Sequence, residues 1–296
     1  MALLIRHADV ITMTERGRFT GDVLIRGSVI DRLGECCIPA AAESVTEIDA
    51  TGLTLAPGYI DCFVRSGGAA EASLRELALA SGVMTALAVP DESGLCMVMD
   101  ADGVKPSCIR LIEAHRLTLL RLRDALAGCT ARGERPLVPI HTKRVLERVL
   151  HEAPTGCRLI LAGFPAAIDD ASLVKEKDTA VIIGHRRGDE RLWRMAGMLD
   201  EAGVPFAVSC RYPAAKMSLL PVIASRAAGA GISPERAMAA ITSGAADLLG
   251  MHDRGRIEEG ARADLLLLTG DPLLISTERV LSIRSGRIQG EAAYTC

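Results

Sequence analysis

Hydrophobic and polar residues alternate with a period of two at both ends of the chain. The pattern runs through LLIRHADVIT, GDVLIRGSVIDRLGE and SVTEIDATG, and it returns in RGRIEEGARADLLLLTG and RVLSIRSGRIQGEAAY near the other end. Such alternation is typical of strands with one buried face, and Arg26-Gly27-Ser28 fits a hairpin turn. The two ends are therefore predicted to meet in one small β-sandwich, formed by residues 1–53 together with 252–296.

Between these ends, residues 54–251 alternate between short apolar runs and amphipathic runs. The apolar runs are TLAPGYIDCFV, VMTALAVP, LCMVMD, RPLVPIHT, RLILAGF, AVIIGH and PFAVSC. The runs with helical spacing include SLRELALASG, IRLIEAHRLTLLRLRDALAG, KRVLERVLHEA, DDASLVKEK, ERLWRMAGMLDEAG and SLLPVIASRAAGAG. Near-continuous apolar strands that alternate with helices predict a parallel sheet buried on both faces.

The favoured α/β architecture is a TIM-like (β/α) barrel, and an open doubly wound sheet is the alternative. The central block is shorter than the ~250 residues of a full eightfold barrel. The barrel is therefore expected to be trimmed or distorted. We expect the irregular part at residues 91–108, and the pattern leaves open how the barrel closes between residues 91 and 135.

Composition narrows the class of protein. The charges nearly cancel, with 34 Lys and Arg against 37 Asp and Glu, which argues against a nucleic-acid binder that depends on phosphate contacts. No apolar run approaches the ~20 residues of a membrane span, and no secretory signal is evident, so a cytoplasmic protein is expected. The nine cysteines include no C-x-x-C pair, and free buried thiols are their expected state.

Several segments resemble one family. TGLTLAPGYID at 51–61 and GISPERAMAAITSGAADLLGMHDRGRIEEGARADLLLLTGDPL at 231–273 resemble the first barrel strand and the last barrel helix of the amidohydrolase superfamily. PLVPIHTKRVLERV at 136–149 is similar to the fifth-strand segment of imidazolonepropionase-like members, and EAGVPFAVSC at 201–210 is similar to the approach to strand 8. A long segment that is usual between strands 2 and 5 is missing.

The resemblance implies a hydrolase that acts on carbon–nitrogen bonds other than peptide bonds, with zinc or another divalent metal that activates water. It implies a His-x-His pair on strand 1, one histidine on each of strands 5 and 6, and an aspartate on strand 8 as metal ligands. The corresponding residues here are Phe63, Arg65, His141, Gly163 and Arg211. Only His141 is a suitable ligand, and a guanidinium repels a divalent ion, so no metal and no other cofactor is expected.

A zinc site made of cysteine and histidine is an alternative, because Cys62, Cys210, His141 and His185 all fall near strand ends. Strand alternation argues against it. If the residues on either side of Cys62 point into the barrel, Cys62 points outward. The same parity places Ser209 inward and Cys210 outward.

Basic residues gather at or just after the predicted C-terminal strand ends, where barrels bind their ligands. They are Arg65, Lys143, Arg144, His185, Arg186, Arg187, Arg211 and Lys216. Because arginine suits carboxylate and phosphate geometry, a small anionic ligand is expected, and its candidate binding residues are Arg65, His185, Arg186 and Arg211. Alternatively, these residues begin exposed helices, or pair with Asp61, Asp91 or Asp189.

His141 and Lys143 are the candidate catalytic residues, because both are expected to face inward beyond strand 5 and a buried amine can act as nucleophile or base. A pair of Ser66 or Ser209 with a histidine is a further alternative, but no G-x-S-x-G elbow supports it. The remaining histidines are expected on sandwich or helix faces. They are His7, His115, His151 and His252.

Three functions stay open on the sequence alone. The first is an amidohydrolase homologue that has lost its metal site, is inactive as a metallohydrolase and binds a small anion. The second is a hydrolase of altered mechanism, metal-free or with one metal held by His141 and other partners. The third is a structural partner of an active relative. A homo-oligomer is expected in each case, because a trimmed barrel should expose apolar surface.

Overall fold

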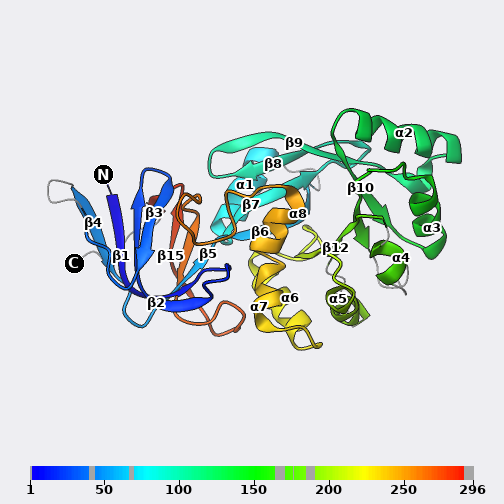
Figure 1. The fold of residues 1–296 in the computed structure, drawn as a ribbon. Coiled ribbons are helices and arrows are strands. Elements are labelled where there is room, and N and C mark those ends of the chain that lie inside the picture. Colours follow the sequence, from blue (N-terminus) through cyan, green and yellow to red (C-terminus); the bar gives the residue numbers. More distant parts are fainter. Residues whose placement is uncertain are drawn as a thin grey trace.

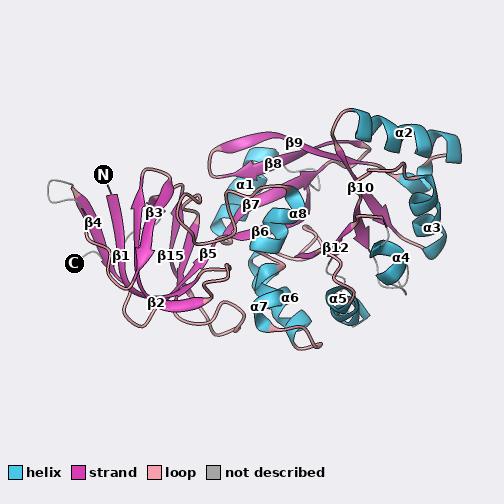
Figure 2. Ribbon diagram, in the orientation of Figure 1, coloured by secondary structure: helices cyan, strands magenta, loops and turns pink. Residues whose placement is uncertain are grey.

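The computed structural model describes residues 2–39, 44–66, 70–163, 171–175, 177–184 and 191–289. Two eight-stranded sheets organise this part of the chain. The first and last strands of the sequence lie together in one sheet, and the central residues form a second sheet with helices around it (Figure 1). Figure 2 shows that the helices are confined to the second unit.

The strands of the end sheet come from both sides of the central region. They are β1 (Ala2–Ile11), β2 (Arg18–Arg26), β3 (Val29–Gly34), β4 (Val45–Asp49), β5 (Thr54–Pro57), β14 (Leu265–Leu268), β15 (Arg279–Arg284) and β16 (Arg287–Gln289). Their order is β16-β15-β14-β5-β1-β2-β3, and β4 pairs with β1. The predicted meeting of the two chain ends is thus present as sheet pairing. A two-layered sandwich is not confirmed by this pairing and stays a prediction, as do the domain boundaries.

The central sheet is barrel-like. Its strands are β6 (Tyr59–Arg65), β7 (Val83–Val89), β8 (Gly94–Asp100), β9 (Gly103–Leu111), β10 (Arg135–Ile140), β11 (Ile160–Gly163), β12 (Ala180–Gly184) and β13 (Phe206–Ser209). They follow one another in sequence order across the sheet, from β6 to β13. All neighbours are parallel except β8, which is antiparallel to both β7 and β9. The predicted TIM-like barrel is therefore present in a modified and nearly closed form.

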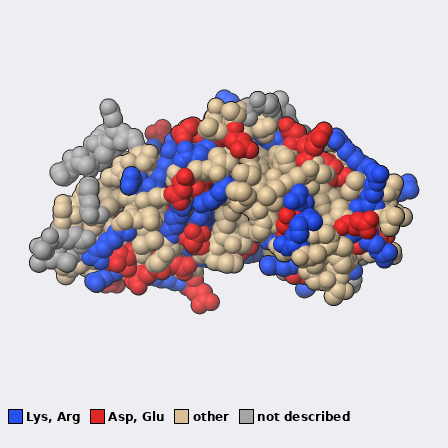
Figure 3. Space-filling view, turned by 90° about the horizontal axis from the view of Figure 1, so that it is seen from above, with Lys and Arg blue, Asp and Glu red and all other residues tan. Residues whose placement is uncertain are grey.

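Helices and short 3₁₀ turns connect the barrel strands. The helices are α1 (Glu71–Ala80), α2 (Leu119–Ala131), α3 (Lys143–Glu152), α4 (Ala171–Lys175), α5 (Arg191–Glu201), α6 (Leu220–Ala228), α7 (Pro234–Ala239) and α8 (Ser243–Leu249), and the 3₁₀ turns are η1 (Ala114–Arg116) and η3 (Met217–Leu219). The described helices are shorter and more polar than a membrane-crossing helix would be. Basic and acidic residues are interleaved over the face shown in Figure 3, as the near balance of charges predicts.

The region 91–108 departs from the strand–helix repeat, as expected, although most of it is strand. Strands β8 and β9 form a tight antiparallel hairpin in which Asp100 pairs with Gly103. This hairpin replaces two helix-containing units of a full barrel and still keeps eight strands in the sheet. The shortened sequence is therefore accommodated by omission of helices, and the sheet itself is not interrupted.

The run IRLIEAHRLTLLRLRDALAG, expected as a single helix, is divided. Its first three residues end β9, η1 follows, and α2 begins only after Thr118. The Thr118 side chain accepts a hydrogen bond from the backbone N–H of Arg121, which caps the helix. Residues 112–117 therefore lie at the C-terminal end of a barrel strand, where ligand sites form.

The run TLAPGYIDCFV is also divided, although it was expected as one strand. Its first part, β5, pairs with β1 and β14 in the end sheet, whereas β6 belongs to the barrel. Gly58 separates the two, and its backbone N–H donates to the carbonyl of Asp264 at 2.8 Å. A Cβ atom at Gly58 would lie 2.3 Å from Cγ of Met84, so the step between the two sheets requires glycine.

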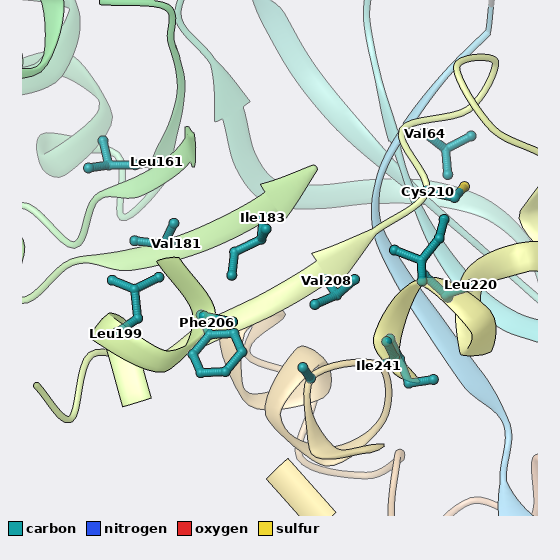
Figure 4. Packing of buried hydrophobic residues seen from close by; sticks show 14 of the residues in the cluster. Val64, Leu161, Val181, Ile183, Leu199, Phe206, Val208, Cys210, Leu220 and Ile241 are labelled. Carbon is teal, nitrogen blue, oxygen red and sulfur yellow. The ribbon is translucent and has the colours of Figure 1, made fainter. Parts of the chain in front are cut away.

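Two hydrophobic clusters line the barrel sheet. The outer one joins strands to helices, as with Val208, Phe206 and Leu220 in Figure 4. The inner one combines alternate strand residues with α8, and it includes Cys62. The expectation that Cys62 faces outward is wrong because the β6–β7 register shifts between Asp61 and Val64, and such a bulge breaks strict alternation.

Buried ion pairs attach the β8–β9 hairpin to the segment that precedes β14. The Arg254 guanidinium, 8% exposed, lies 3.0 Å from the carboxylate of Asp100, which is fully buried. Arg254 also donates to the hydroxyl of Thr85 at 3.1 Å. Burial by itself raises the pKa of Asp100, but the hydrogen bonds from Arg254 and Lys105 outweigh it and lower that pKa. The hairpin is thus anchored at the end opposite to residues 112–117.

We predict that Gly58→Ala destabilises the protein by about 1–3 kcal/mol, because the added methyl group overlaps Met84. The matched control is Gly197→Ala in α5, where a Cβ atom meets nothing within 4 Å. That change should stabilise the protein slightly, by about 0.5–1 kcal/mol, since alanine favours helix. Urea unfolding of both variants measures the two free energies. Equal stability of Gly58→Ala and the unchanged protein would contradict the steric argument.

Candidate functional site

A buried carboxylate joins the first and last barrel strands. Asp61 on β6 is completely buried and accepts hydrogen bonds from the Ser209 hydroxyl at 2.5 Å and from the Cys210 backbone N–H at 3.2 Å. It also accepts from the Phe63 backbone N–H at 3.1 Å, and its second oxygen lies 2.7 Å from the Cys210 sulfur. The Asp61 side chain therefore fixes the relative position of β6 and β13. We call this contact between Asp61, Ser209 and Cys210 the seam.

Ionisation at this seam is governed by burial. Burial raises the pKa of Asp61, although the hydrogen bonds from Cys210 and Ser209 act in the opposite direction. Burial, and then the charge of Asp61, also raises the pKa of the Cys210 thiol, which stays protonated and can donate to the carboxylate. Two backbone hydrogen bonds also hold β6 in place. The N–H of Ile60 donates to the carbonyl of Ile241, and the N–H of Arg65 donates to the carbonyl of Tyr212.

Two arginines lie over a buried aromatic ring at the barrel mouth, by which we mean the opening at the C-terminal ends of the barrel strands. Phe63 is 1% exposed and belongs to the inner cluster. The guanidinium carbon of Arg65 lies 5.7 Å from the centre of the Phe63 ring, and that of Arg211 lies 5.4 Å from it. Cations within ~6 Å of a ring centre are attracted to its face. Phe63 therefore brings both positive charges to one place.

The backbone of β12 leaves room for Arg211. A Cβ atom at Gly184, the last residue of β12, would lie 1.9 Å from Cδ of Arg211. The backbone N–H of Arg211 donates to the Ser209 hydroxyl at 2.9 Å, and its φ of +52° is in the left-handed region. Arg211 is therefore held in a strained conformation by the same hydroxyl that binds Asp61.

The end of β9 brings a carboxylate and an imidazole to the mouth. Glu113, 6% exposed at its side chain, lies 3.0 Å from the Arg65 guanidinium through one oxygen and 3.2 Å from Nδ1 of His115 through the other. The His115 and His141 rings meet edge to face with centroids 5.2 Å apart. The ends of β6, β9 and β10 therefore bring four ionisable side chains into one group, although they are far apart in the sequence.

The environment of His141 favours its neutral form. Burial lowers the pKa of His141, and the neighbouring His115 lowers it further, although Glu113 acts in the opposite direction. The charges of Arg211 and Arg65 lower it as well. At neutral pH His141 is thus a neutral imidazole that can accept or donate one hydrogen bond.

The structure brings together some of the residues singled out from the sequence. Arg65, Arg211 and His141 lie at the mouth, whereas His185 and Arg186 lie outside the described residues. Lys143 is exposed as the first residue of α3, so the expectation of an inward, buried amine is wrong. Its catalytic role is untested.

The pairing expected for the arginines also differs in part. Arg65 contacts Glu113, which was not among the acidic partners considered. Ser209 is fully buried and its hydroxyl donates to Asp61. A substrate cannot reach this hydroxyl, so Ser209 is not favoured as a nucleophile. Cys210 belongs to the outer cluster, as alternation predicted.

The metal-ligand set implied by the resemblance does not fit the residues present. Phe63 fills the barrel interior, and the guanidinium groups of Arg65 and Arg211 lie beside it. Gly163, at the end of β11, has no ligand atom. Only His141 offers a donor, and two permanent positive charges oppose a divalent ion at these positions.

Sequence reasoning missed Glu113. His115 was expected on a sandwich or helix face, and it lies on the 3₁₀ turn η1, where it contacts Glu113. The omission of Glu113 follows from the interpretation of IRLIEAHRLTLLRLRDALAG as one helix. The first residues of this run, Ile109 to Leu111, continue the pattern of a buried strand. They could have indicated that the strand ends just before Glu113 and His115. Thr118, a good N-cap residue, marks the later helix start.

The fold is that of an amidohydrolase-like barrel. The amidohydrolase family model matches residues 215–295 of the chain. No curated protein sequence matches. The fold of nearly the whole chain is that of solved amidohydrolase structures, so the resemblance to the amidohydrolase superfamily is confirmed at the level of the fold. The finer likeness to imidazolonepropionase-like members stays a prediction.

Three solved structures illustrate this similarity. An amidohydrolase from Thermotoga maritima MSB8 is 19% identical with a TM-score of 0.81, over 97% of this chain and 99% of that one. A Xaa-Pro dipeptidase with methionine bound in its active site is 14% identical with a TM-score of 0.76, over 98% and 100%. Enamidase is 16% identical with a TM-score of 0.73, over 97% and 95%. At these identities the comparison establishes the fold.

We predict that Asp61→Ala destabilises the protein by about 3 kcal/mol, because buried donors on Ser209 and Cys210 lose their acceptor. The control Asp124→Ala, on the exposed face of α2, should change stability by less than about 0.5 kcal/mol. Urea unfolding measures both. If the two variants are equally stable, Asp61 does not hold the seam.

The pH dependence of this contribution has a definite sign. Because the pKa of Asp61 is raised in the folded state, protonation favours folding. The contribution is fully present below the pKa of the unfolded chain and is lost as pH rises through the folded-state pKa. The stability of the unchanged protein relative to Asp61→Asn should therefore fall as pH rises from 4 toward neutrality. A pH-independent difference between the two would contradict the raised pKa.

Proposed function

We propose that this protein binds a small anionic ligand of the carboxylate or phosphate class at the barrel mouth and does not carry out the metal-dependent hydrolysis that the resemblance implies. The observation that carries the proposal is the placement of Arg65 and Arg211 over Phe63, at positions where the resemblance implies metal ligands. A mouth that presents guanidinium groups attracts an anion in place of a cation.

The charge balance supports an anionic ligand. Arg65 is paired with Glu113, so this guanidinium contributes little net charge. Arg211 adds a second positive charge, and His141 is neutral at neutral pH because its pKa is lowered. The formal net charge of the chain is −3, so the two guanidinium groups beside Phe63 form a local basic feature in an acidic protein. An anion can therefore be attracted locally although the protein as a whole is acidic.

The geometry supports Arg211 as the principal anchor. Its backbone is held by the Ser209 hydroxyl, and the absence of a side chain at Gly184 leaves space for its aliphatic part. A guanidinium whose position is fixed before binding loses little entropy when it forms two hydrogen bonds to a carboxylate or phosphate. The neutral His141 imidazole can add a further hydrogen bond.

We predict that inorganic phosphate or succinate raises the melting temperature of the protein, and that Arg211→Gln removes this effect. At ligand concentrations 100-fold above Kd the stabilisation is about 2.7 kcal/mol, which corresponds to several degrees. Scanning fluorimetry with EDTA present measures the shift without metal.

The control Arg121→Gln changes an exposed arginine on α2 and should keep the full shift. Arg65→Gln is a poorer test because it leaves the buried Glu113 carboxylate without its arginine. The proposal fails if neither phosphate, sulfate, acetate nor succinate stabilises the protein, or if Arg211→Gln responds as the unchanged protein does.

A second candidate function is hydrolysis by an altered mechanism. It is favoured by the contact between Glu113 and Nδ1 of His115, since a carboxylate that orients an imidazole makes it a better general base. Assays of Xaa-Pro dipeptides and cyclic amides test it, because a structural neighbour is a Xaa-Pro dipeptidase. Turnover that His115→Gln abolishes would favour this candidate. The third possibility, a partner subunit of an active relative, requires co-purification of that relative.

We also propose a cytoplasmic homo-oligomer. Exposed apolar side chains on η3 and on the loop after β14 support self-association, namely Leu219 (43% exposed), Leu274 (59%) and Ile275 (86%). We predict a mass of at least twice the chain mass of 31.3 kDa in light scattering. A monomer at all concentrations would exclude the proposal.

A further inference from the structure

A cavity of about 1180 Å³ lies between the end sheet and the barrel. One wall comes from α1 and the turn between β8 and β9, and the other comes from β1, β4 and the hairpins β2–β3 and β15–β16. The β8–β9 turn precedes β9, whereas the barrel mouth is at the end of β9, so the cavity and the mouth lie on opposite sides of the barrel. The cavity is larger than the ~300–1,000 Å³ of typical pockets for small organic ligands.

One arginine in the cavity wall lacks hydrogen-bond partners. The Nε atom is buried and unpaired in four arginines of the described ranges, namely Arg65, Arg135, Arg148 and Arg284. In the first three, another guanidinium nitrogen donates to a carboxylate or to a backbone carbonyl. No hydrogen bond joins the Arg284 guanidinium to any residue that the structure describes. Buried polar groups without a partner are rare in folded proteins, so Arg284 calls for an explanation.

The acidic residues of the cavity wall are engaged with other arginines. Glu76 pairs with Arg75 at 2.6 Å, and Asp102 pairs with Arg262 at 2.5 Å. Burial lowers the pKa of Arg284, and the charge of Glu76 opposes this effect, whereas two neighbouring arginines lower the pKa further. A bound anion would supply both the opposite charge and the acceptor atoms that this guanidinium lacks.

A second arginine lies directly opposite the first. Arg284 on β15 and Arg287 on β16 are paired across the hairpin, and both line the cavity. Like charges directly opposite each other destabilise a strand pair, and an anion bound by both guanidinium groups removes this repulsion. The hairpin turn is held in place, because a Cβ atom at Gly286 would lie 1.9 Å from the carbonyl oxygen of Gly27 in the β2–β3 turn.

We propose that this cavity binds a phosphorylated organic molecule of about nucleotide size, with its phosphate group on Arg284 and Arg287. A phosphate has enough oxygen atoms to accept hydrogen bonds from two guanidinium groups. Leu3, Leu79 and Ile288 line the same cavity and provide apolar surface for the organic part. The proposal goes beyond the anion site at the mouth and does not depend on it, since the two sites share no residue.

Fluorescence titration with trinitrophenyl-ATP tests the inference, because this probe combines phosphate groups with a large apolar group. The unchanged protein should bind it with a dissociation constant in the micromolar range. ATP should displace the probe, whereas adenosine, which has no phosphate, should not. Arg284→Gln should weaken binding by about 10–100-fold, since hydrogen bonds to a charged group are lost. Arg287→Gln, at an exposed position, should also weaken binding and is the second variant if Arg284→Gln does not fold.

Arg32→Gln is the matched control. Arg32 also belongs to the end sheet, but its side chain is 62% exposed and it does not line the cavity. This variant should bind the probe as the unchanged protein does. Arg211→Gln distinguishes the two sites, because it removes the proposed anchor at the mouth and should leave binding in the cavity intact. Melting temperatures without ligand verify that the variants fold.

The inference is overturned if the unchanged protein does not bind the probe, or if both cavity variants bind it with unchanged affinity. Equal displacement by ATP and adenosine would show that phosphate is not recognised and would also contradict it. Loss of binding in Arg211→Gln, with full binding in Arg284→Gln, would place the probe at the mouth. That last result would exclude the cavity and leave the proposed anion site standing.

Discussion

The geometry of the barrel mouth depends on the buried carboxylate of Asp61. It lies where β6 and β13, the first and last strands of the sheet, approach each other, and it binds donors from both. The Ser209 hydroxyl that donates to Asp61 also accepts from the backbone of Arg211. One buried acceptor thus contributes to barrel closure and to the placement of a guanidinium at the mouth. A buried polar group with all its partners satisfied specifies one arrangement, because any displacement leaves donors unpaired.

The other side of the mouth depends on the β8–β9 hairpin. A full barrel would have helices between these strands, whereas here two antiparallel steps carry the chain across the sheet. The hairpin is held by the buried contact between Arg254 and Asp100. Its last strand delivers Glu113 and His115 to a position beside His141 and Arg65. The hairpin therefore ends beside the group of ionisable side chains at the mouth.

Much of the fold could be predicted from the pattern of residues. The strand runs VMTALAVP, RPLVPIHT and PFAVSC were correctly placed because buried parallel strands are continuously apolar. The correspondence of Phe63 and Arg211 to metal-ligand positions rests on the alignment of short motifs and stays a prediction. Cys62 was misplaced because alternation assumes a regular strand, and the shifted register of β6 is a property of its pairing with β7. Glu113 was missed because a strand end followed by a helix shares its apolar spacing with one longer helix.

The sequence by itself determined the two kinds of unit and most of the order of strands and helices. These features follow from local periodicity and from residue chemistry, which neighbouring residues carry without reference to distant ones. Only the tertiary structure decided that Arg65 pairs with Glu113, that Asp61 bridges to Ser209, and that the rings of His115 and His141 meet. Each of these contacts joins residues far apart in the chain. Their geometry depends on strand register and closure, which no local pattern encodes.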